Sequence, residues 1–169
     1  MKKLLDLFSD PKNLALTLGL ASLGTLTFVY ISQYVFHYDP CILCLYQRKP
    51  YFAVLALAAA AFFAEPKIRF YLLLLCGAAF LAGTGIAGYH NGVEQEWWAG
   101  TQACGDASLP QNASIEELKE YLMNKKIVRC DVPSWKFLGL SMTAYNLMLS
   151  LGLSAFTFYF ALQGRKKNA

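Results

Sequence analysis

Two cysteines, Cys41 and Cys44, are separated by two residues, and Arg48 follows the second cysteine by four positions. A Cys-x-x-Cys motif is typical of a redox-active dithiol, of half of a metal site or of haem attachment. Haem attachment requires a histidine directly after the second cysteine, and this chain has Leu45 there. A purely structural bridge is a weak explanation, because so short a disulfide loop constrains the unfolded chain little. The motif therefore favours redox chemistry between a dithiol and its disulfide.

A second candidate pair consists of Cys104 and Cys130. These residues could complete a zinc site with the first pair, but they lack the close spacing of a typical ligand pair, and we expect no metal. If bridged to each other, they close a loop of about 27 residues, which corresponds to roughly 3.5 kcal/mol of stabilisation in the chain-entropy model. The bridge is therefore a credible structural element. It is also a candidate redox pair, because thiol–disulfide exchange needs only one sulfur reaching another.

Three ionisable residues are candidates for assisting this chemistry. A cation at Arg48 lies on the same helix face as Cys44 and can stabilise a thiolate or hydrogen-bond an anionic acceptor. The alternative is that Arg48 only snorkels to lipid head groups. At the outer end of a later apolar segment, His90 could hydrogen-bond or protonate a reduced acceptor, or it could be an ordinary interfacial residue. Glu94 is a weaker candidate of the same kind.

The elements that must position these residues are membrane helices. The 169-residue chain is 56% hydrophobic and only 15% charged, whereas soluble domains carry about 25% charged residues. A transmembrane helix needs about 20 apolar residues. We predict an all-α membrane protein, a single-domain bundle of four spans at about 14–36, 45–64, 68–89 and 137–162. The first apolar run exceeds a signal-peptide core of about 7–15 residues, so we interpret it as a true span.

The second span decides where the Cys-x-x-Cys motif lies. Its plainly apolar part, residues 51–64, is too short to cross a membrane, so the helix is expected to begin near Leu45. Cys44 then lies at a helix N-terminus, where free N–H groups favour a thiolate. Proline at position 50 is tolerated this early in a helix. The alternative is a short, shallow helix that begins at Pro50.

The third span carries a motif that we reject. Its glycines at 83, 85 and 88 match the dinucleotide fingerprint G-x-G-x-x-G, which has meaning only between a strand and a helix. Within a membrane span, small residues instead allow neighbouring helices to approach closely. In the same span, Cys76 is interpreted as a small apolar residue.

Basic residues gather at the chain ends and in the turn after the second span: Lys2, Lys3, Lys12, Lys67, Arg69, Arg165, Lys166 and Lys167. The positive-inside rule assigns these segments, and therefore both termini, to the cytoplasm. Loops 37–44 and 90–136 then lie on the opposite side, where disulfides persist. In the long loop a capping box at Ser114 predicts a short amphipathic helix. Nucleic-acid binding is not expected, because no basic patch is interleaved with stacking aromatic residues.

Several short motifs together form a specific pattern: Pro-Cys-Ile-Leu-Cys-Leu-Tyr-Gln-Arg at 40–48, Tyr-His-Asn-Gly-Val-Glu at 89–94, Cys104, Cys-Asp at 130–131, Trp135 and Phe-Leu-Gly-Leu-Ser-Met at 137–142. In this pattern the chain resembles the bacterial disulfide-bond-formation protein B (DsbB) family. The resemblance spans nearly the whole chain. The resemblance gives no role to Gln47, a position that is not uniform in the family.

The resemblance implies a protein-disulfide:quinone oxidoreductase in the bacterial inner membrane, with its redox loops in the periplasm. A reduced DsbA-type thioredoxin-fold oxidase would be reoxidised by the Cys104–Cys130 disulfide. Electrons would then pass to Cys41 and Cys44 and on to ubiquinone or menaquinone. In this scheme Cys44 contacts the quinone, Arg48 holds it and His90 is a possible helper.

Two other classes of protein fit parts of the sequence. A four-span scaffold with a disulfide-stabilised outer loop, similar in layout to tetraspanins, needs neither a Cys-x-x-Cys motif in its first loop nor Arg48 beyond it. The chain also lacks the Cys-Cys-Gly motif of tetraspanin loops. A membrane metal-binding protein is the third interpretation, and metal analysis with thiol counting separates it from the redox interpretation.

Overall fold

The structure, a computed structural model, describes residues 7–101, 104, 114–116 and 128–168. Within these residues the chain is mostly helical. Its elements are helices α2 (Pro11–Tyr34), α3 (Ile42–Phe63), α4 (Pro66–Glu94) and α6 (Met142–Asn168), and strands β1 (Lys136–Phe137) and β2 (Leu140–Ser141).

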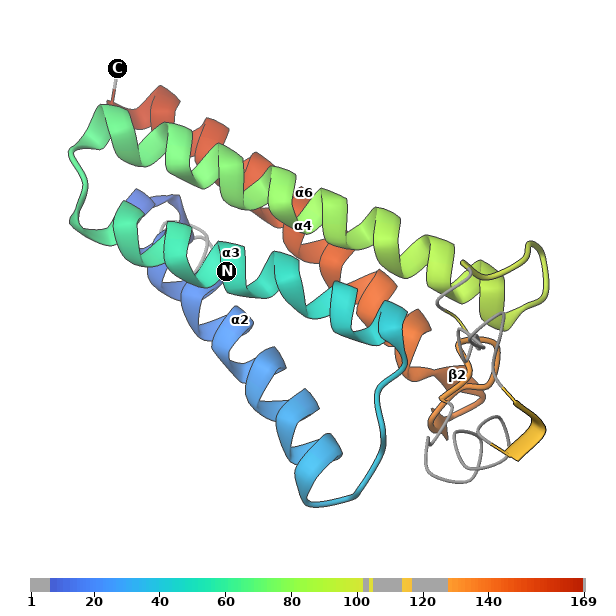
Figure 1. Ribbon diagram of the computed structural model, residues 1–169. Coiled ribbons are helices and arrows are strands. Elements are labelled where there is room, and N and C mark those ends of the chain that lie inside the picture. The colour runs from blue at the N-terminus through green and yellow to red at the C-terminus, as the bar shows by residue number, and fades with distance from the viewer. Residues whose placement is uncertain (1–6, 102–103, 105–113, 117–127, 169) are drawn as a thin grey trace.

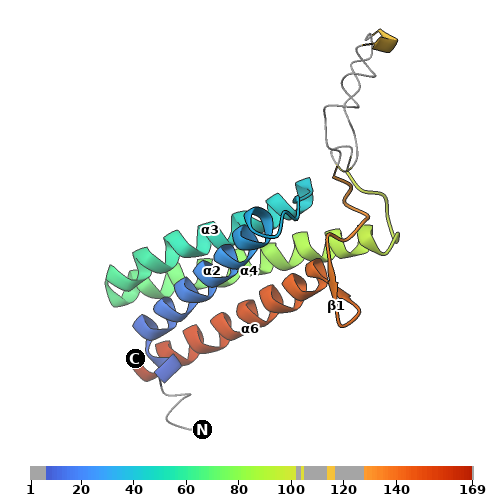
Figure 2. The ribbon, with the colours of Figure 1, turned by 90° about the horizontal axis from the view of Figure 1, so that it is seen from below.

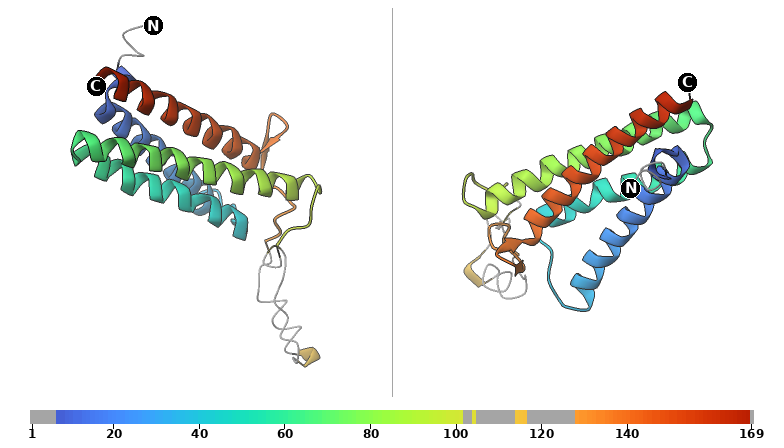
Figure 3. Two further views of the ribbon diagram at one scale, coloured as in Figure 1. Left: turned by 90° about the horizontal axis from the view of Figure 1, so that it is seen from above. Right: turned by 180° about the vertical axis from the view of Figure 1, so that it is seen from behind.

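The long helices run back and forth along one bundle axis. In Figures 1 and 3, the start of α2, the α3–α4 turn and the end of α6 lie at one end. The α2–α3 connection, the segment after α4 and the short hairpin lie toward the other end. Helix α4 packs against both α3 and α6, and α2 packs mainly on α3. Cysteines far apart in sequence therefore come to the same end of the bundle.

Within the described residues, three helices are long and apolar enough to cross a membrane: α2, α4 and residues 142–165 of α6. Helix α3 has a comparable length of 22 residues. It is not among these three, and Gln47, Arg48 and Lys49 occupy its first two turns. The predicted count of four spans therefore stays a prediction, although all four predicted segments overlap a helix.

Helix α3 begins earlier than expected and does not break at its proline. Cys41 is its N-cap in extended backbone conformation, and Pro50 lies inside the helix. The proline ring packs against α4, where a Cβ added at Gly83 would lie 3.3 Å from the Pro50 Cβ. The alternative of a short helix that starts at Pro50 is therefore wrong, and Arg48 lies in the second turn of a continuous helix.

Helix α4 uses small residues for close packing, as the sequence suggested. The side chain of Phe158 on α6 covers Gly77, and Ser154 donates a hydrogen bond to the Gly77 carbonyl at 3.0 Å. Cys76 is fully buried in the apolar core that α2, α3, α4 and α6 share. The G-x-G-x-x-G motif at 83–88 is helical throughout, as a packing motif requires.

The last helix begins at Met142 rather than near 137, because residues 136–141 form the antiparallel hairpin of β1 and β2. The hairpin turn contains Leu138 and Gly139, both with positive φ. Ser141 then accepts a hydrogen bond from the Ala144 amide through its side chain, as a helix cap does. Figure 2 shows the hairpin at the start of α6. The predicted amphipathic helix lies mostly outside the described residues, which include only 114–116 of it.

Candidate active site

The four loop cysteines meet at one end of the bundle. Cys104 and Cys130 form a disulfide with their Cα atoms 5.2 Å apart. Cys41 and Cys44 are unbonded, with their sulfur atoms 3.0 Å apart. Cys41 and Cys130 are buried in one apolar cluster, and Cys44 and Cys104 pack against it. The structure thus brings together the two pairs that the sequence indicated.

The helix N-terminus acts on Cys41 rather than on Cys44. The Cys41 sulfur caps α3 by accepting a hydrogen bond from the Cys44 amide at 3.3 Å. A hydrogen bond from the Cys44 thiol is the main cause that lowers the pKa of Cys41, and His90 adds to this effect against the opposing effect of burial. We expected the helix end to favour a thiolate at Cys44. Because the helix begins about one turn earlier than predicted, the N-cap is Cys41, and the helix end favours a thiolate there instead.

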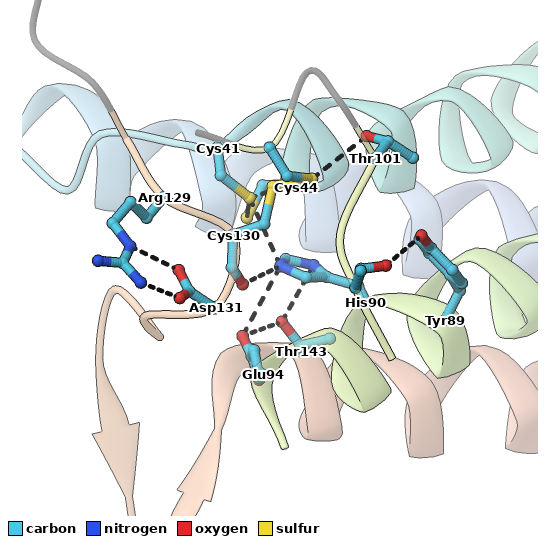
Figure 4. Close-up of a disulfide and its surroundings, with 12 residues drawn as sticks. Cys41, Cys44, Tyr89, His90, Glu94, Thr101, Arg129, Cys130, Asp131 and Thr143 are labelled. Atoms are coloured by element: carbon cyan, nitrogen blue, oxygen red, sulfur yellow. Dashed lines mark hydrogen bonds and ion pairs between the residues drawn. A yellow bond between two sulfur atoms is a disulfide. The ribbon is translucent and has the colours of Figure 1, made fainter. Parts of the chain in front are cut away.

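His90 faces the sulfur atoms. Its Nε2 atom lies 3.5 Å from the Cys41 sulfur and 3.2 Å from the Cys130 carbonyl oxygen. Only 1% of the residue is exposed. Figure 4 shows the imidazole between the cysteines on one side and Glu94 and Thr143 on the other. His90 is not among the residues that line the apolar pocket described below. Its contact with an acceptor stays a prediction.

A carboxylate lies behind the imidazole. Glu94 Oε1 accepts a hydrogen bond from Thr143 at 2.7 Å and lies 3.8 Å from His90 Nε2. Within the part of the chain that the structure describes, its other oxygen is buried without a hydrogen-bond partner. A buried carboxylate stabilises a neighbouring positive charge. Glu94 is therefore placed to stabilise the positive end of the imidazole N–H at Nε2.

A chain of hydrogen bonds, which we call the relay, begins at the Nδ1 atom of His90. Gln47 Nε2 lies 2.6 Å from His90 Nδ1, and Asn146 donates to Gln47 Oε1 at 2.5 Å. Tyr51 donates to Asn146 Oδ1 at 2.6 Å. This pattern orients the Gln47 amide so that it donates to His90, which leaves the imidazole hydrogen on Nε2, facing Cys41 and the Cys130 carbonyl.

A largely apolar cavity of about 140 Å³ opens beside the start of α3. By the measure that one water needs about 10–15 Å³, it has room for a small ring system. Its lining combines aromatic side chains with a few polar groups. It includes Phe28, Tyr38, Cys44, Gln47, Arg48, Tyr51, Trp135 and Asn146. The pocket and the cysteine cluster therefore lie on two sides of the same helix turn.

Arg48 lines this pocket together with Cys44, but its contacts are with α2. Its guanidinium donates to Gln33 Oε1 at 2.7 Å and lies 5.0 Å above the ring of Tyr30. These two contacts hold the cation at the pocket wall. A direct interaction with the Cys44 sulfur remains a prediction.

Sequence reasoning missed Gln47 and Asn146. Both are polar residues within apolar segments, and both lie on the helix face that turns toward the bundle interior. Polar residues in such segments usually face the bundle interior and take part in function. Applied to position 47, next to Arg48, this rule would have found the glutamine.

The same geometry also brings three potential metal ligands together. The donor atoms of Cys41, Cys44 and His90 all lie within 4.8 Å of one another. Two thiolates bound tetrahedrally to zinc at about 2.3 Å are roughly 3.8 Å apart, whereas these sulfur atoms are 3.0 Å apart. The shorter separation favours disulfide chemistry. The bonded sulfur atoms of Cys104 and Cys130 are also not available as thiolate ligands.

The bundle and its cysteines define a class of protein: a multi-pass membrane protein that holds a dithiol beside a disulfide. The family model described as disulfide bond formation protein DsbB matches residues 11–160. The chain belongs to the DsbB family.

Individual relatives agree with this assignment. An uncharacterized protein of Rickettsia prowazekii (strain Madrid E), RP370, is 34% identical over 146 residues, which cover 86% of this chain and 84% of that protein. A protein named disulfide bond formation protein B from Dechloromonas aromatica is 27% identical over 147 residues, covering 83% of this chain and 86% of its own. One of the same name from Acinetobacter baumannii is 28% identical over 165 residues, covering 89% and 94%. No solved structure matches the chain significantly.

Proposed function

We propose that this chain is a protein-disulfide:quinone oxidoreductase that reoxidises a DsbA-type periplasmic thiol oxidase. One observation carries the proposal. The first turn of α3 presents Cys41 to the cluster that contains the Cys104–Cys130 disulfide, while Cys44 lines an apolar pocket. A single Cys-x-x-Cys motif thus connects a protein disulfide with a site for a lipophilic molecule.

The pocket suits the head group of a quinone. A flat apolar ring with carbonyl oxygens needs aromatic walls and a few hydrogen-bond donors. The pocket provides the rings of Phe28 and Trp135, and it provides donors on Arg48 and Asn146. A quinone bound there, ubiquinone or menaquinone, supplies the oxidant that takes up two electrons and two protons.

Exposure of the sulfur atoms suggests the order of exchange. Cys104 is half-buried, whereas only 1% of Cys130 is exposed. A thiolate of the partner would therefore attack Cys104, form a mixed disulfide and release Cys130 as a thiolate. Cys130 lies beside Cys41 and would attack it in turn, which breaks a Cys41–Cys44 disulfide and leaves Cys44 as a thiolate at the pocket.

The second thiol of the partner attacks the partner's own sulfur in the mixed disulfide, which releases the oxidised partner and frees Cys104 as a thiolate. Cys104 would then attack Cys130 in the Cys41–Cys130 disulfide, which re-forms the Cys104–Cys130 disulfide and releases Cys41 as a thiolate. The reduced Cys41 and Cys44 would pass two electrons and two protons to a quinone and close their own disulfide.

His90 and Glu94 would stabilise a thiolate at Cys41. The imidazole lies within reach of the Cys41 sulfur and of the Cys130 carbonyl. It can stabilise the Cys41 thiolate when this sulfur is a leaving group or a nucleophile. Glu94 Oε1, 3.8 Å from Nε2, stabilises the positive end of the N–H that faces Cys41.

The proposed topology follows from the same arrangement. Four spans through α2, α3, α4 and α6 put both chain ends in the cytoplasm of a bacterial inner membrane. The redox end, with loops 37–44 and 90–136, then faces the periplasm. This orientation agrees with the basic residues at the chain ends and in the α3–α4 turn.

The test combines purified full-length protein, a short-chain quinone and a reduced DsbA-type oxidase, with quinone absorbance as the readout. We expect catalytic loss of the quinone spectrum and stoichiometric disulfide formation in the partner. A Cys44→Ser variant should abolish both. Stoichiometric metal in the purified protein, with no turnover, would instead support the metal-binding interpretation.

A further inference from the structure

A second cavity, of about 1010 Å³, lies at the end of the bundle opposite the cysteines. Its walls come from the start of α2, the start of α4 and the last turns of α6 (Figures 1 and 3). These are the three helices that are long and apolar enough to cross a membrane. The cavity therefore lies at the depth where such helices leave the apolar layer and meet the lipid head groups.

The charge of this cavity is strongly one-sided. Its lining includes four cationic side chains, those of Lys12, Lys67, Arg69 and Arg165. It includes one carboxylate, that of Asp10. The carboxylate of Asp10 caps α2 by accepting a hydrogen bond from the Lys12 amide at 2.8 Å. One of its oxygen atoms is thus bonded within its own helix, and the four cations still outnumber this one carboxylate.

Two of the cations are held in place. Only 8% of Arg69 is exposed, and its guanidinium donates to the carbonyl oxygens of Ala61 and Ala64 at the end of α3. Arg165 lies 4.9 Å above the ring of Phe70. Cations that only snorkel to the membrane surface would spread outward around the bundle. Here they converge on one cavity from three helices.

The backbone adds to the preference for an anion. Helix α4 has no acidic residue in its first turn, and the side chain of its N-cap, Glu65, makes no capping hydrogen bond. Because Pro66 has no N–H group, the groups available to an anion are the N–H groups of Lys67 and Ile68 and the positive end of the helix dipole. The wall next to them is apolar and contains Phe70, Tyr71 and Leu73.

We propose that this cavity binds the phosphodiester head group of an anionic phospholipid such as phosphatidylglycerol. The phosphodiester would lie between Lys67 and Arg165, and the start of an acyl chain would lie along the apolar wall that includes Tyr71. A basic pocket between membrane helices on the cytoplasmic side suits such a head group. A free phosphate ion would use the cations but not the apolar wall. The site is independent of the thiol chemistry at the other end.

The test uses the full-length protein in a neutral detergent. Thermal unfolding and native mass spectrometry are followed as short-chain phosphatidylglycerol, short-chain phosphatidylcholine or inorganic phosphate is added. We expect saturable stabilisation and a retained lipid adduct with phosphatidylglycerol only. Since each basic residue near an anionic lipid contributes about fivefold in affinity, K67Q/R165Q should bind roughly 30-fold more weakly.

Two matched variants make the result specific. R129Q/K136Q also removes two positive charges, but at the cysteine end of the bundle. This variant should bind phosphatidylglycerol like the parent. K67R/R165K keeps both cations and should retain binding, which separates a loss of charge from a loss of folding. Equal stabilisation by inorganic phosphate or by phosphatidylcholine overturns the proposal. Parent-like binding by K67Q/R165Q, or an equal loss in R129Q/K136Q, also overturns it.

Discussion

The Nε2 atom of His90 lies 3.5 Å from the sulfur of Cys41, although 49 residues separate them in the chain. The opposite nitrogen of the imidazole faces Gln47, which Asn146 orients in turn. Gln47 and Asn146 also line the apolar pocket. One relay of hydrogen bonds therefore connects Cys41, the sulfur that exchanges with the second pair, with the site proposed for the electron acceptor.

The first prediction concerns the pH at which Cys41 reacts. Because its pKa is lowered mainly by the hydrogen bond from Cys44, its thiolate should persist to lower pH than that of an ordinary cysteine. In reduced protein, alkylation of Cys41 should therefore slow only when the pH falls below this lowered pKa. Cys44→Ala removes the hydrogen bond and should move the midpoint to higher pH. Cys44→Ser keeps a donor and should move it less. Peptide mass spectrometry after timed alkylation measures these midpoints, and equal midpoints in all three proteins would contradict the assignment.

The second prediction concerns the contact between Arg48 and Gln33. A hydrogen bond to a charged group contributes about 1.5–3 kcal/mol, which is roughly 10- to 100-fold in affinity. Gln33→Ala should therefore raise KM for quinone by about tenfold with little change in kcat, because the guanidinium is no longer held at the pocket wall. Arg48→Ala should lower kcat/KM further. Steady-state kinetics at varied quinone concentration measure both.

The neighbouring cation provides the control for this prediction. Lys49 is exposed and lies over the ring of Tyr46, 4.4 Å from its centre. Lys49→Gln removes one positive charge next to Arg48 and should leave KM for quinone close to that of the parent. If Lys49→Gln and Gln33→Ala raise KM equally, the effect comes from general electrostatics and not from the placement of Arg48.

The position of the first cysteine pair could be predicted from the sequence because span length is a physical constraint. An apolar stretch of 14 residues cannot cross a bilayer, so a membrane helix had to extend back through Arg48. Small residues in the third span likewise predicted the close packing that Gly77 and Gly83 show. Both arguments depend on local sequence alone.

Contacts between distant segments could not be predicted in this way. His90 faces Cys41 because α4 continues to Glu94, beyond the predicted end of its span near 89, and this extension aligns its last turns with the start of α3. Similarly, the hairpin at 136–141 replaces the expected start of the last helix. Leu138 and Gly139 both adopt positive φ in its turn. Of these two residues, only glycine commonly adopts positive φ, so the sequence gives only a weak signal for the turn.

The third prediction concerns entry of electrons from the partner. Cys104→Ser removes the more accessible sulfur of the Cys104–Cys130 disulfide and should abolish oxidation of a reduced DsbA-type protein. A small dithiol that reaches Cys41 and Cys44 directly should still support quinone reduction by this variant. Parallel assays with the protein substrate and with the small dithiol separate the two steps. Normal oxidation of the partner by Cys104→Ser would refute the proposed order of exchange.

The fourth prediction uses two glycines of the rejected nucleotide motif. A methyl group at position 83 would lie 3.3 Å from the Cβ of Pro50, whose ring is bonded to the backbone and cannot move aside, whereas nothing lies within 4 Å of a methyl group at Gly85. Gly83→Ala should therefore destabilise the bundle by about 1–3 kcal/mol through overpacking. Gly85→Ala should be neutral or stabilise it by up to about 1 kcal/mol, since alanine favours helix more than glycine does. Thermal unfolding in detergent, followed by circular dichroism, compares the two variants with the parent. Because both substitutions would destroy a nucleotide fingerprint equally, a loss of stability confined to Gly83→Ala identifies the motif as a packing surface between α3 and α4.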